Sequence, residues 1–374
     1  MAKWGAFTFE GEEVLPGTRH EASLQVGNDP LGQSAGIPVH VIHGANPGPC
    51  VAVTAAIHGD ELNGTGIIHR LVYGDDHLAD TKDDHVDPSS LAGTLLLVPV
   101  VNVEAMMMGT RNSPDGRDMN RLFPGKKTGN QSQRIAEAVF SRIIKRADYH
   151  IDLHTAPQSR VNVPQIRADL SNSTCKRLAR AFGTEVVMGS QGPEGSIRRA
   201  ALDAGIPSIL FECGTSHRFE PKALTTGVRG ILNVLAELEM LERSKTKPMW
   251  RVLVKQFRWI RAPEGGMLHL LIEEGALVKE GDAIAHLTDP FGARVDTVIS
   301  PVNGLVVGLA TTPLVRPGDP IANVVYVREK KMLEIIEKDT KAGLPPRRED
   351  AKVQEATIED ENGATLDETE RSAS

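Results

Sequence analysis

The sequence predicts an α/β protein in which a mixed, mostly parallel β-sheet is covered by helices on both faces, followed by a C-terminal β-sandwich or barrel domain. Between residues 35 and 240, short apolar runs alternate with segments of helical apolar spacing, which is typical of parallel sheets. After residue 247 the pattern changes to short β runs separated by Gly and Pro. We therefore expect an α/β domain at 1–247, a β domain at 248–335 and a charged, disordered tail at 336–374.

The individual elements follow from apolar periodicity. Residues up to about 45 are rich in β-forming side chains, and the run that begins at Val51 alternates Val and Ala, as a strand buried on both faces does. Asp75 to Ser90 is acidic, contains His77 and His85, and predicts a surface segment. Strands are predicted at 37–43, 51–57, 94–101, 148–155, 184–188 and 208–213, and helices at 62–73 and 131–145 and in a segment that ends near Lys247.

Two strand ends carry side chains that bind metals. His58 and Glu61 lie three residues apart where the strand from Val51 turns into a helix, and Gly59 between them allows the turn. An imidazole nitrogen and a carboxylate oxygen there can bind one cation at about 2.0–2.2 Å. His154 ends a second predicted strand, and ligands bind at the carboxyl ends of strands in open α/β sheets. The three residues supply the ligand number of a catalytic zinc, with Asp152 as a partner of a ligand imidazole.

The alternative for these residues is structural. His58 and His154 would then be ordinary histidines at strand ends, and Glu61 an acid favoured by the dipole of the first helical turn. Each residue taken alone fits that reading, so the metal site depends on the three lying together.

A long loop at 109–125 lies between the strand at 94–101 and the helix at 131–145. It has no periodicity and is rich in Gly, Pro, Asp, Asn and Arg, and long loops in compact domains are usually functional or disordered. Its amide and guanidinium donors, which suit a carboxylate or a polarised carbonyl, are Arg111, Arg117, Asn120 and Arg121. A flexible basic surface loop is the alternative, but the apolar residues at 122–124 favour an anchored loop.

Glu212 is an acid near the end of the apolar strand at 208–213. A carboxylate in such a strand is costly unless it is paired or acts as a base. The alternative is an acid at the exposed end of the strand.

Together these motifs resemble the aspartoacylase/succinylglutamate desuccinylase family, which has a zinc-carboxypeptidase-like fold. The matching segments are His-Gly-Asp-Glu-Leu-Asn-Gly at 58–64, Gly-Thr-Arg and Asp-Met-Asn-Arg-Leu-Phe-Pro-Gly within 109–125, Ile-Asp-Leu-His at 151–154 and Phe-Glu-Cys-Gly at 211–214. The resemblance implies Zn²⁺ held by His58, Glu61 and His154, catalytic roles for Glu212 and Arg111, and substrate contacts from Asn120, Arg121 and Arg198. The sequence does not decide between Arg111 and Arg117, or between Arg198 and Arg199.

The function that this resemblance implies is a zinc-dependent amidohydrolase that removes a small acyl group from an N-acyl amino acid or related metabolite. Zinc would activate water and polarise the amide carbonyl, and Glu212 would serve as general base and then general acid. A zinc metallocarboxypeptidase acting on small peptides would use the same ligands and is the first alternative. A non-catalytic carrier or binding protein is the second.

The C-terminal β region contains an internal repeat. Residues 276–285 recur at 313–322, which predicts two matching β halves, and the pattern resembles the biotinyl/lipoyl-carrier fold. Such carriers modify a lysine in the hairpin between the halves, whereas the segment from Asp289 to Arg294 has none. A lid or assembly role is therefore preferred, and a homo-oligomer is possible.

Composition limits the partners and the compartment. The net charge of −7 argues against nucleic acid, and no apolar run reaches the length of a membrane span. The N-terminus lacks the pattern of a secretory signal, and the three cysteines are scattered, so we expect a cytoplasmic protein with reduced thiols.

Overall fold

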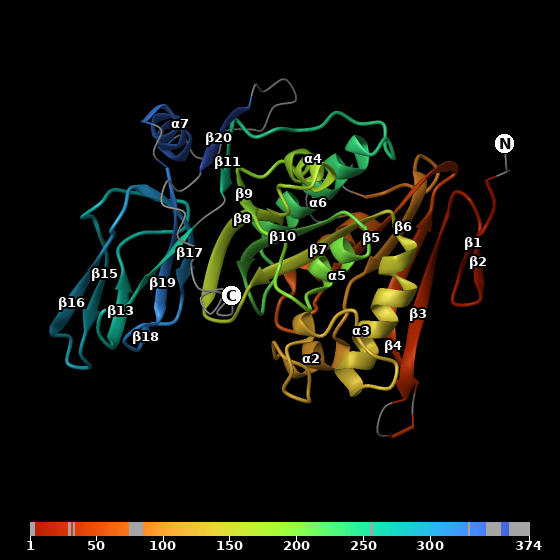
Figure 1. Ribbon diagram of the computed structural model, residues 1–374, viewed down its shortest axis with the longest axis horizontal. Coiled ribbons are helices and arrows are strands. Elements are labelled where there is room, and N and C mark those ends of the chain that lie inside the picture. The colour runs from red at the N-terminus through yellow and green to blue at the C-terminus, as the bar shows by residue number, and fades with distance from the viewer. Residues whose placement is uncertain are drawn as a thin grey trace.

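The computed structural model describes residues 4–28, 31–32, 34–74, 85–254, 257–327, 330–341 and 353–358. Figure 1 shows the C-terminal strands at one end of the molecule and the N-terminal strands at the other, with the α/β part between them. Most of the segment predicted as a surface excursion, including His77, lies outside the described residues, as do residues 342–352 and 359–374 of the predicted tail.

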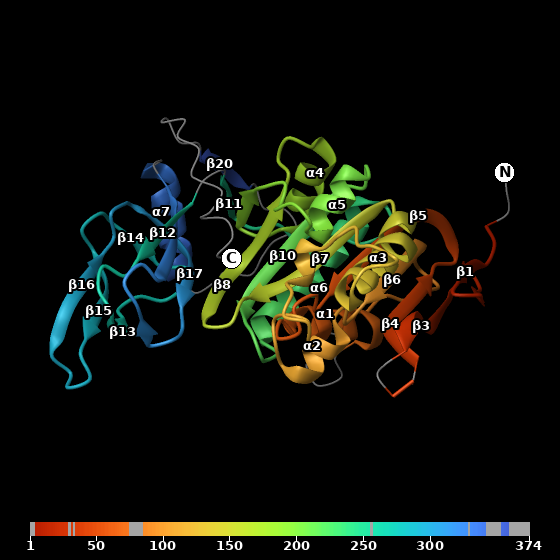
Figure 2. The same ribbon diagram turned by 60° about the horizontal axis from the view of Figure 1, so that its bottom comes forward.

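A large mixed sheet forms the frame of the α/β part. Its central strands pair in the order β8-β10-β7-β5-β6-β4-β3, and β10-β7, β7-β5 and β5-β6 are parallel. Figure 2 shows β8, β10 and β7 running side by side. The strands of this part are β3 (Thr18–Asn28), β4 (Ser34–His43), β5 (Asn46–Ala55), β6 (Ala92–Val98), β7 (Tyr149–Ala156), β8 (Arg160–Ala168), β9 (Val186–Gly189), β10 (Ser208–Thr215) and β11 (Trp250–Val254), with a separate hairpin of β1 (Phe7–Phe9) and β2 (Glu12–Val14).

Helices cover both faces of this sheet, as predicted. On one face α1 (Asn63–Tyr73), α4 (Ser173–Phe182) and α6 (Pro221–Glu237) share an apolar core with β5, β7 and β10. On the other face α3 (Gln131–Arg142) and α5 (Ile197–Asp203) form a second core with β3, β4 and β6. The short helices α2 (Val103–Met108), η1 (Met119–Arg121) and η2 (Ile144–Arg146) complete the α/β part.

Two glycines allow the close packing that places the segment after β5. A Cβ atom on Gly59 would lie 2.1 Å from the backbone carbon of Ala105 in α2, and one on Gly64 would lie 2.8 Å from the Cβ of Ala55. Neither glycine has a positive φ. Gly59 lies in a turn, as the sequence predicted, and its lack of a side chain also lets two backbone segments approach.

The C-terminal β region is a sandwich. A four-stranded sheet in the order β16-β15-β13-β18 faces strands β12, β19, β17 and β14, and both sides contribute to one apolar core. Within the described residues the pairing order does not close into a barrel. The strands are β12 (Arg258–Arg261), β13 (Gly266–Leu270), β14 (Leu277–Val278), β15 (Ala283–Thr288), β16 (Arg294–Ile299), β17 (Gly304–Ala310), β18 (Leu314–Val315) and β19 (Pro320–Tyr326).

The two copies of the sequence repeat form the same local structure. In the first copy the backbone N–H of Lys279 donates to Asp282, and in the second that of Arg316 donates to Asp319, both at 2.8 Å. Each copy is a two-residue strand, a turn and a longer strand. The predicted repeat is thus visible as two equivalent strand-turn-strand units, in which the two strands pair with other strands and not with each other.

Three features differ from the sequence prediction or were not anticipated. The helix expected to end near Lys247 ends at Glu237, since α6 is followed by an irregular segment. Part of the predicted tail has secondary structure, because β20 (Gln354–Ile358) pairs with β11 and α7 (Lys330–Lys341) overlaps the expected boundary. Strand β17 pairs with β8, so the C-terminal strands extend the main sheet. The proposed domain limits stay a prediction.

No helix among the described residues is long and apolar enough to cross a membrane. The three cysteines are free. The cytoplasmic location and the possible homo-oligomer stay predictions.

Candidate active site

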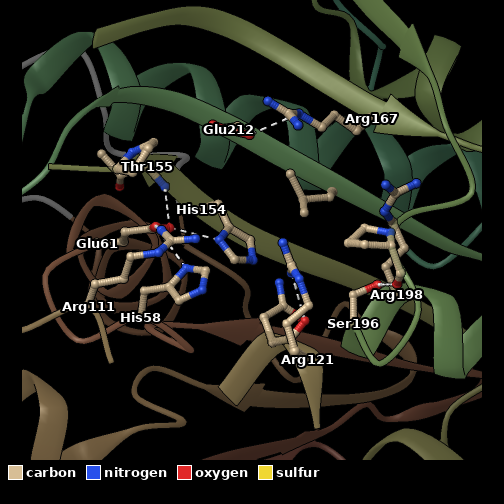
Figure 3. Close-up of a pocket in the computed structure, with 14 residues that line it drawn as sticks. His58, Glu61, Arg111, Arg121, His154, Thr155, Arg167, Ser196, Arg198 and Glu212 are labelled. Carbon is tan, nitrogen blue, oxygen red and sulfur yellow. Dashed lines mark hydrogen bonds and ion pairs between the residues drawn. The ribbon is translucent and has the colours of Figure 1, made fainter. Parts of the chain in front are cut away.

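Three potential metal ligands converge at the carboxyl ends of β5 and β7. His58 and Glu61 follow β5, His154 lies on β7, and their ligand atoms all lie within 4.8 Å of one another. All three side chains are buried, with exposures of 3%, 2% and 6%. Figure 3 shows the two imidazoles and the carboxylate facing one another. The structure therefore brings together the residues that the sequence placed on separate strands.

The contacts within this group fit a cation. Nδ1 of His58 lies 2.8 Å from Oε1 of Glu61, and Nδ1 of His154 lies 2.7 Å from Oε2 of the same carboxylate. The buried Nδ1 of His58 makes no hydrogen bond despite that short contact. Two imidazole nitrogens and a carboxylate are also the donor types that zinc prefers.

The far nitrogen of each imidazole contacts a carboxylate. Nε2 of His58 lies 3.0 Å from Asp118, and Nε2 of His154 lies 2.8 Å from Asp152. Such contacts orient a ligand imidazole and leave its Nδ1 directed to the metal position. Asp152 was expected from the sequence, but Asp118 was not, although it belongs to the loop at 109–125.

The group also holds opposite charges close together. Burial alone would raise the pKa of Glu61, but His58 and His154 outweigh it and hold that pKa well below its usual value. Burial alone would lower the pKa of His154, but Asp152 and Glu61 raise it to about 10. A proton and a metal ion would thus compete for the buried Nδ1 of His154.

Glu212 lies beside the three ligands. It is the register partner of His154 on the adjacent parallel strand β10, and its side chain is only 9% exposed. Asn162 donates a hydrogen bond to Oε1 at 2.6 Å, and Nε of Arg167 forms an ion pair with Oε2 at 3.0 Å. Figure 3 shows this ion pair above the metal-ligand group. The predicted alternative, an exposed acid at the strand end, is excluded by this burial.

The loop at 109–125 is anchored, and its residues Arg111 and Arg121 line the site. Arg111 forms an ion pair with Glu61 at 2.6 Å, whereas Arg117 is exposed and pairs with Asp115. The backbone N–H of Phe123, which is buried, donates to Gly195 at 2.9 Å. Of the two loop arginines left open by the sequence, Arg111 is therefore the one that faces the ligands.

The sequence also left open whether Arg198 or Arg199, which are neighbours on α5, faces the site. Arg198 is buried and lines the pocket, and its Nε has no hydrogen-bond partner. Burial lowers the pKa of Arg198 to about 10, so the side chain stays cationic at neutral pH. The neighbouring Arg199 is exposed and pairs with Asp203. Arg198 therefore faces the site.

These side chains line one small cavity of about 60 Å³. Asn120 and Arg121 also line it, and the Oδ1 atom of Asn120 accepts from the backbone N–H of Ile197 at 2.9 Å. Arg167, another lining residue, was missed from the sequence, because Pro164 interrupts the alternating pattern of its strand. The polar residues that share the cavity are His58, Glu61, Arg111, Asn120, Arg121, His154, Thr155, Arg167, Ser196, Arg198 and Glu212.

Comparisons with known proteins are consistent with the fold and the motifs. A family profile described as the succinylglutamate desuccinylase/aspartoacylase catalytic domain matches residues 47–238, which is more than half of the chain. The N-alpha-acetyl-L-2,4-diaminobutyric acid deacetylase of Halomonas elongata is 25% identical over 336 residues, covering 86% of this chain and 94% of that protein.

Two solved structures have the same fold as this chain. A succinylglutamate desuccinylase/aspartoacylase from Rhodobacter sphaeroides matches with a TM-score of 0.71 and 27% identity, covering 83% of this chain and 96% of that one. The product-bound ectoine utilization protein EutE (DoeB) from Ruegeria pomeroyi has the same fold, with a TM-score of 0.72, 23% identity and coverage of 83% and 95%.

Proposed function

The protein belongs to the succinylglutamate desuccinylase/aspartoacylase family, and from that membership we propose that it is a zinc-dependent amidohydrolase that removes a small acyl group from an N-acyl amino acid. The observation that carries the proposal is the cluster of His58, Glu61 and His154 ligand atoms in a cavity that also contains Glu212. The deacetylase name of the Halomonas elongata relative supports this class of reaction.

In this proposal His58 and His154 hold the metal through Nδ1, and Glu61 holds it through its carboxylate. When bound, zinc supplies Lewis-acid polarisation of the acyl carbonyl and of water. The carboxylates of Asp118 and Asp152 keep the two imidazoles oriented toward it.

Glu212 is proposed to move the proton. Its carboxylate accepts a proton from the attacking water and then gives it to the leaving amine nitrogen, so one residue serves as base and acid. The ion pair with Arg167 and the hydrogen bond from Asn162 fix that carboxylate beside His154.

Arginines supply the positive charge that the substrate needs. Arg111, which forms an ion pair with Glu61, is proposed to stabilise the oxyanion that develops on the acyl carbonyl. Arg121 and Arg198, with Asn120, are proposed to bind the carboxylate of the amino acid, since guanidinium groups donate paired hydrogen bonds to carboxylates.

A substrate panel tests the proposal. Purified zinc-loaded protein would be assayed against N-acetyl amino acids, N-succinyl amino acids and dipeptides, and we expect turnover of one acyl amino acid class and little cleavage of dipeptides. Preferential cleavage of dipeptides would instead support the carboxypeptidase alternative, and no turnover of any substrate by zinc-loaded protein would contradict both hydrolase assignments.

A further inference from the structure

A chain of buried polar side chains leads from His154 into the middle of the sheet. It consists of Asp152 and His150 on β7, Thr54 on β5 and Ser208 on β10, and each of these four residues has an exposure of 0%. Thr54 is the register partner of Asp152, and Ser208 is that of His150. Residues 150, 152 and 154 alternate along one strand, so their side chains lie on the same face of the sheet.

The contacts along this chain are continuous. Nε2 of His154 lies 2.8 Å from Oδ2 of Asp152, and the hydroxyl of Thr54 donates to Oδ1 of Asp152 at 2.7 Å. Nε2 of His150 lies 2.9 Å from the Thr54 oxygen, and Nδ1 of His150 lies 2.8 Å from the Ser208 hydroxyl. The metal-ligand group is thus linked to a side chain four contacts away.

The direction of every hydrogen bond follows from the donors and acceptors. An ionised Asp152 only accepts, so His154 donates from Nε2 and Thr54 donates its single hydroxyl proton. The Thr54 oxygen must then accept from Nε2 of His150. Burial lowers the pKa of His150 to about 4, so this imidazole is neutral at neutral pH and its Nδ1 accepts from Ser208.

We propose that Thr54 and His150 are positioning residues for the metal site. They hold the Asp152 carboxylate in the orientation that keeps the proton of His154 on Nε2 and the lone pair of Nδ1 directed to the metal position. This inference rests on the proposed zinc site and adds two residues that touch neither metal nor substrate. Removing the Thr54 hydroxyl should loosen Asp152, and with it His154, without removing any ligand.

The competing explanation is that the chain merely satisfies buried polar groups and stabilises the fold. The same sheet contains a matched pair for separating the two effects. The hydroxyl of Thr94 on β6 lies 2.9 Å from Nδ1 of His43 on β4, and both residues are buried. This pair also joins a buried threonine hydroxyl to an imidazole, although here the hydroxyl donates, because Nε2 of His43 donates to the carbonyl of Gly5. It has no contact with the metal-ligand group.

The experiment compares zinc dissociation constants, measured by competition with a chromophoric chelator, for wild type and the variants Thr54→Val, Thr54→Ser and Thr94→Val. Thermal unfolding of each metal-free protein gives the structural effect. We expect Thr54→Val to weaken zinc binding about 10-fold, the lower range for outer contacts of a metal site. Thr54→Ser should restore the affinity, while Thr94→Val should lower the unfolding temperature and leave the affinity unchanged.

An unchanged zinc affinity in Thr54→Val, or an equal loss in Thr94→Val, would overturn the proposal. If Thr54→Val did not fold, Ser208→Ala at the far end of the chain would replace it, with a smaller loss of affinity expected and an unchanged value counting against the proposal. Failure of wild type to bind zinc would contradict the metal site itself. Tight binding by both wild type and Thr54→Val would contradict only the positioning role.

Discussion

Replacing Glu212 with Gln tests the proposed proton transfer. In the structure Oε1 accepts a hydrogen bond from Asn162 at 2.6 Å, and Oε2 pairs with Arg167 at 3.0 Å. Glutamine keeps the size of the side chain and one oxygen acceptor for Asn162, but it has no negative charge for Arg167 and does not accept a proton from water. None of the three metal ligands is altered, so zinc should remain bound.

The expected loss of rate is that of general acid–base catalysis, about 10²–10⁴-fold in kcat. At about 1.36 kcal/mol for each tenfold change, this raises the activation barrier by about 3–5 kcal/mol. The stability cost should be smaller than the roughly 3–5 kcal/mol of breaking a fully buried ion pair, because the Arg167 side chain is 19% exposed and retains contact with water. The variant should therefore fold.

The assay is steady-state kinetics with the best substrate of the panel at saturating zinc, together with the zinc content and the unfolding temperature. Glu237→Gln is a matched control, since Glu237 pairs with Arg177 at 3.3 Å and does not line the cavity, and it should leave kcat unchanged. A Glu212→Gln protein that retains zinc and turns over within roughly tenfold of wild type would refute the reasoning, because another group would then activate the water.

Three further predictions concern side chains around the same cavity. Arg121→Lys should raise KM more than it lowers kcat, because the charge remains but the paired donors are lost. Arg111→Lys should mainly lower kcat. The reverse pattern in steady-state kinetics would exchange the roles of the two arginines. Arg167→Met should lower kcat on the order of 10–10²-fold by misplacing Glu212, with zinc content unchanged, and an unaltered kcat would remove Arg167 from the account. Gly64→Ala should lower the free energy of unfolding by about 1–3 kcal/mol in chemical denaturation, because the added methyl enters the packed contact between α1 and β5, and wild-type stability would contradict that packing.

The sequence was most informative where a residue signals its role locally. Apolar runs predicted β5, β7 and β10, and the abrupt polar residues that end them marked His58, His154 and Glu212. Such polar residues stand out in the sequence, because burying a polar group in an apolar strand is costly unless the group is paired or has a functional role. The repeat of residues 276–285 at 313–322 could also be recognised from short segments of sequence, and both copies form the same turn.

Features that depend on distant partners were not predictable in this way. Arg167 lies on β8, whose alternation is broken by Pro164, and its pairing with Glu212 is set by two neighbouring strands. Strand β20 looked like part of a charged tail, yet it pairs with β11, and Glu355 on β20 forms an ion pair with Arg180 of α4. Neither the charges nor the periodicity of one segment reveal such long-range contacts.

The proposed zinc site is tested most directly by metal content. Elemental analysis of wild type and His154→Ala, each dialysed after zinc loading, should give about one zinc per chain for wild type and almost none for the variant, since two remaining ligands do not hold zinc. His40→Ala, which removes a histidine of β4 outside the cavity, should retain the metal. Full zinc occupancy in His154→Ala, or an absence of zinc in wild type, would contradict the account.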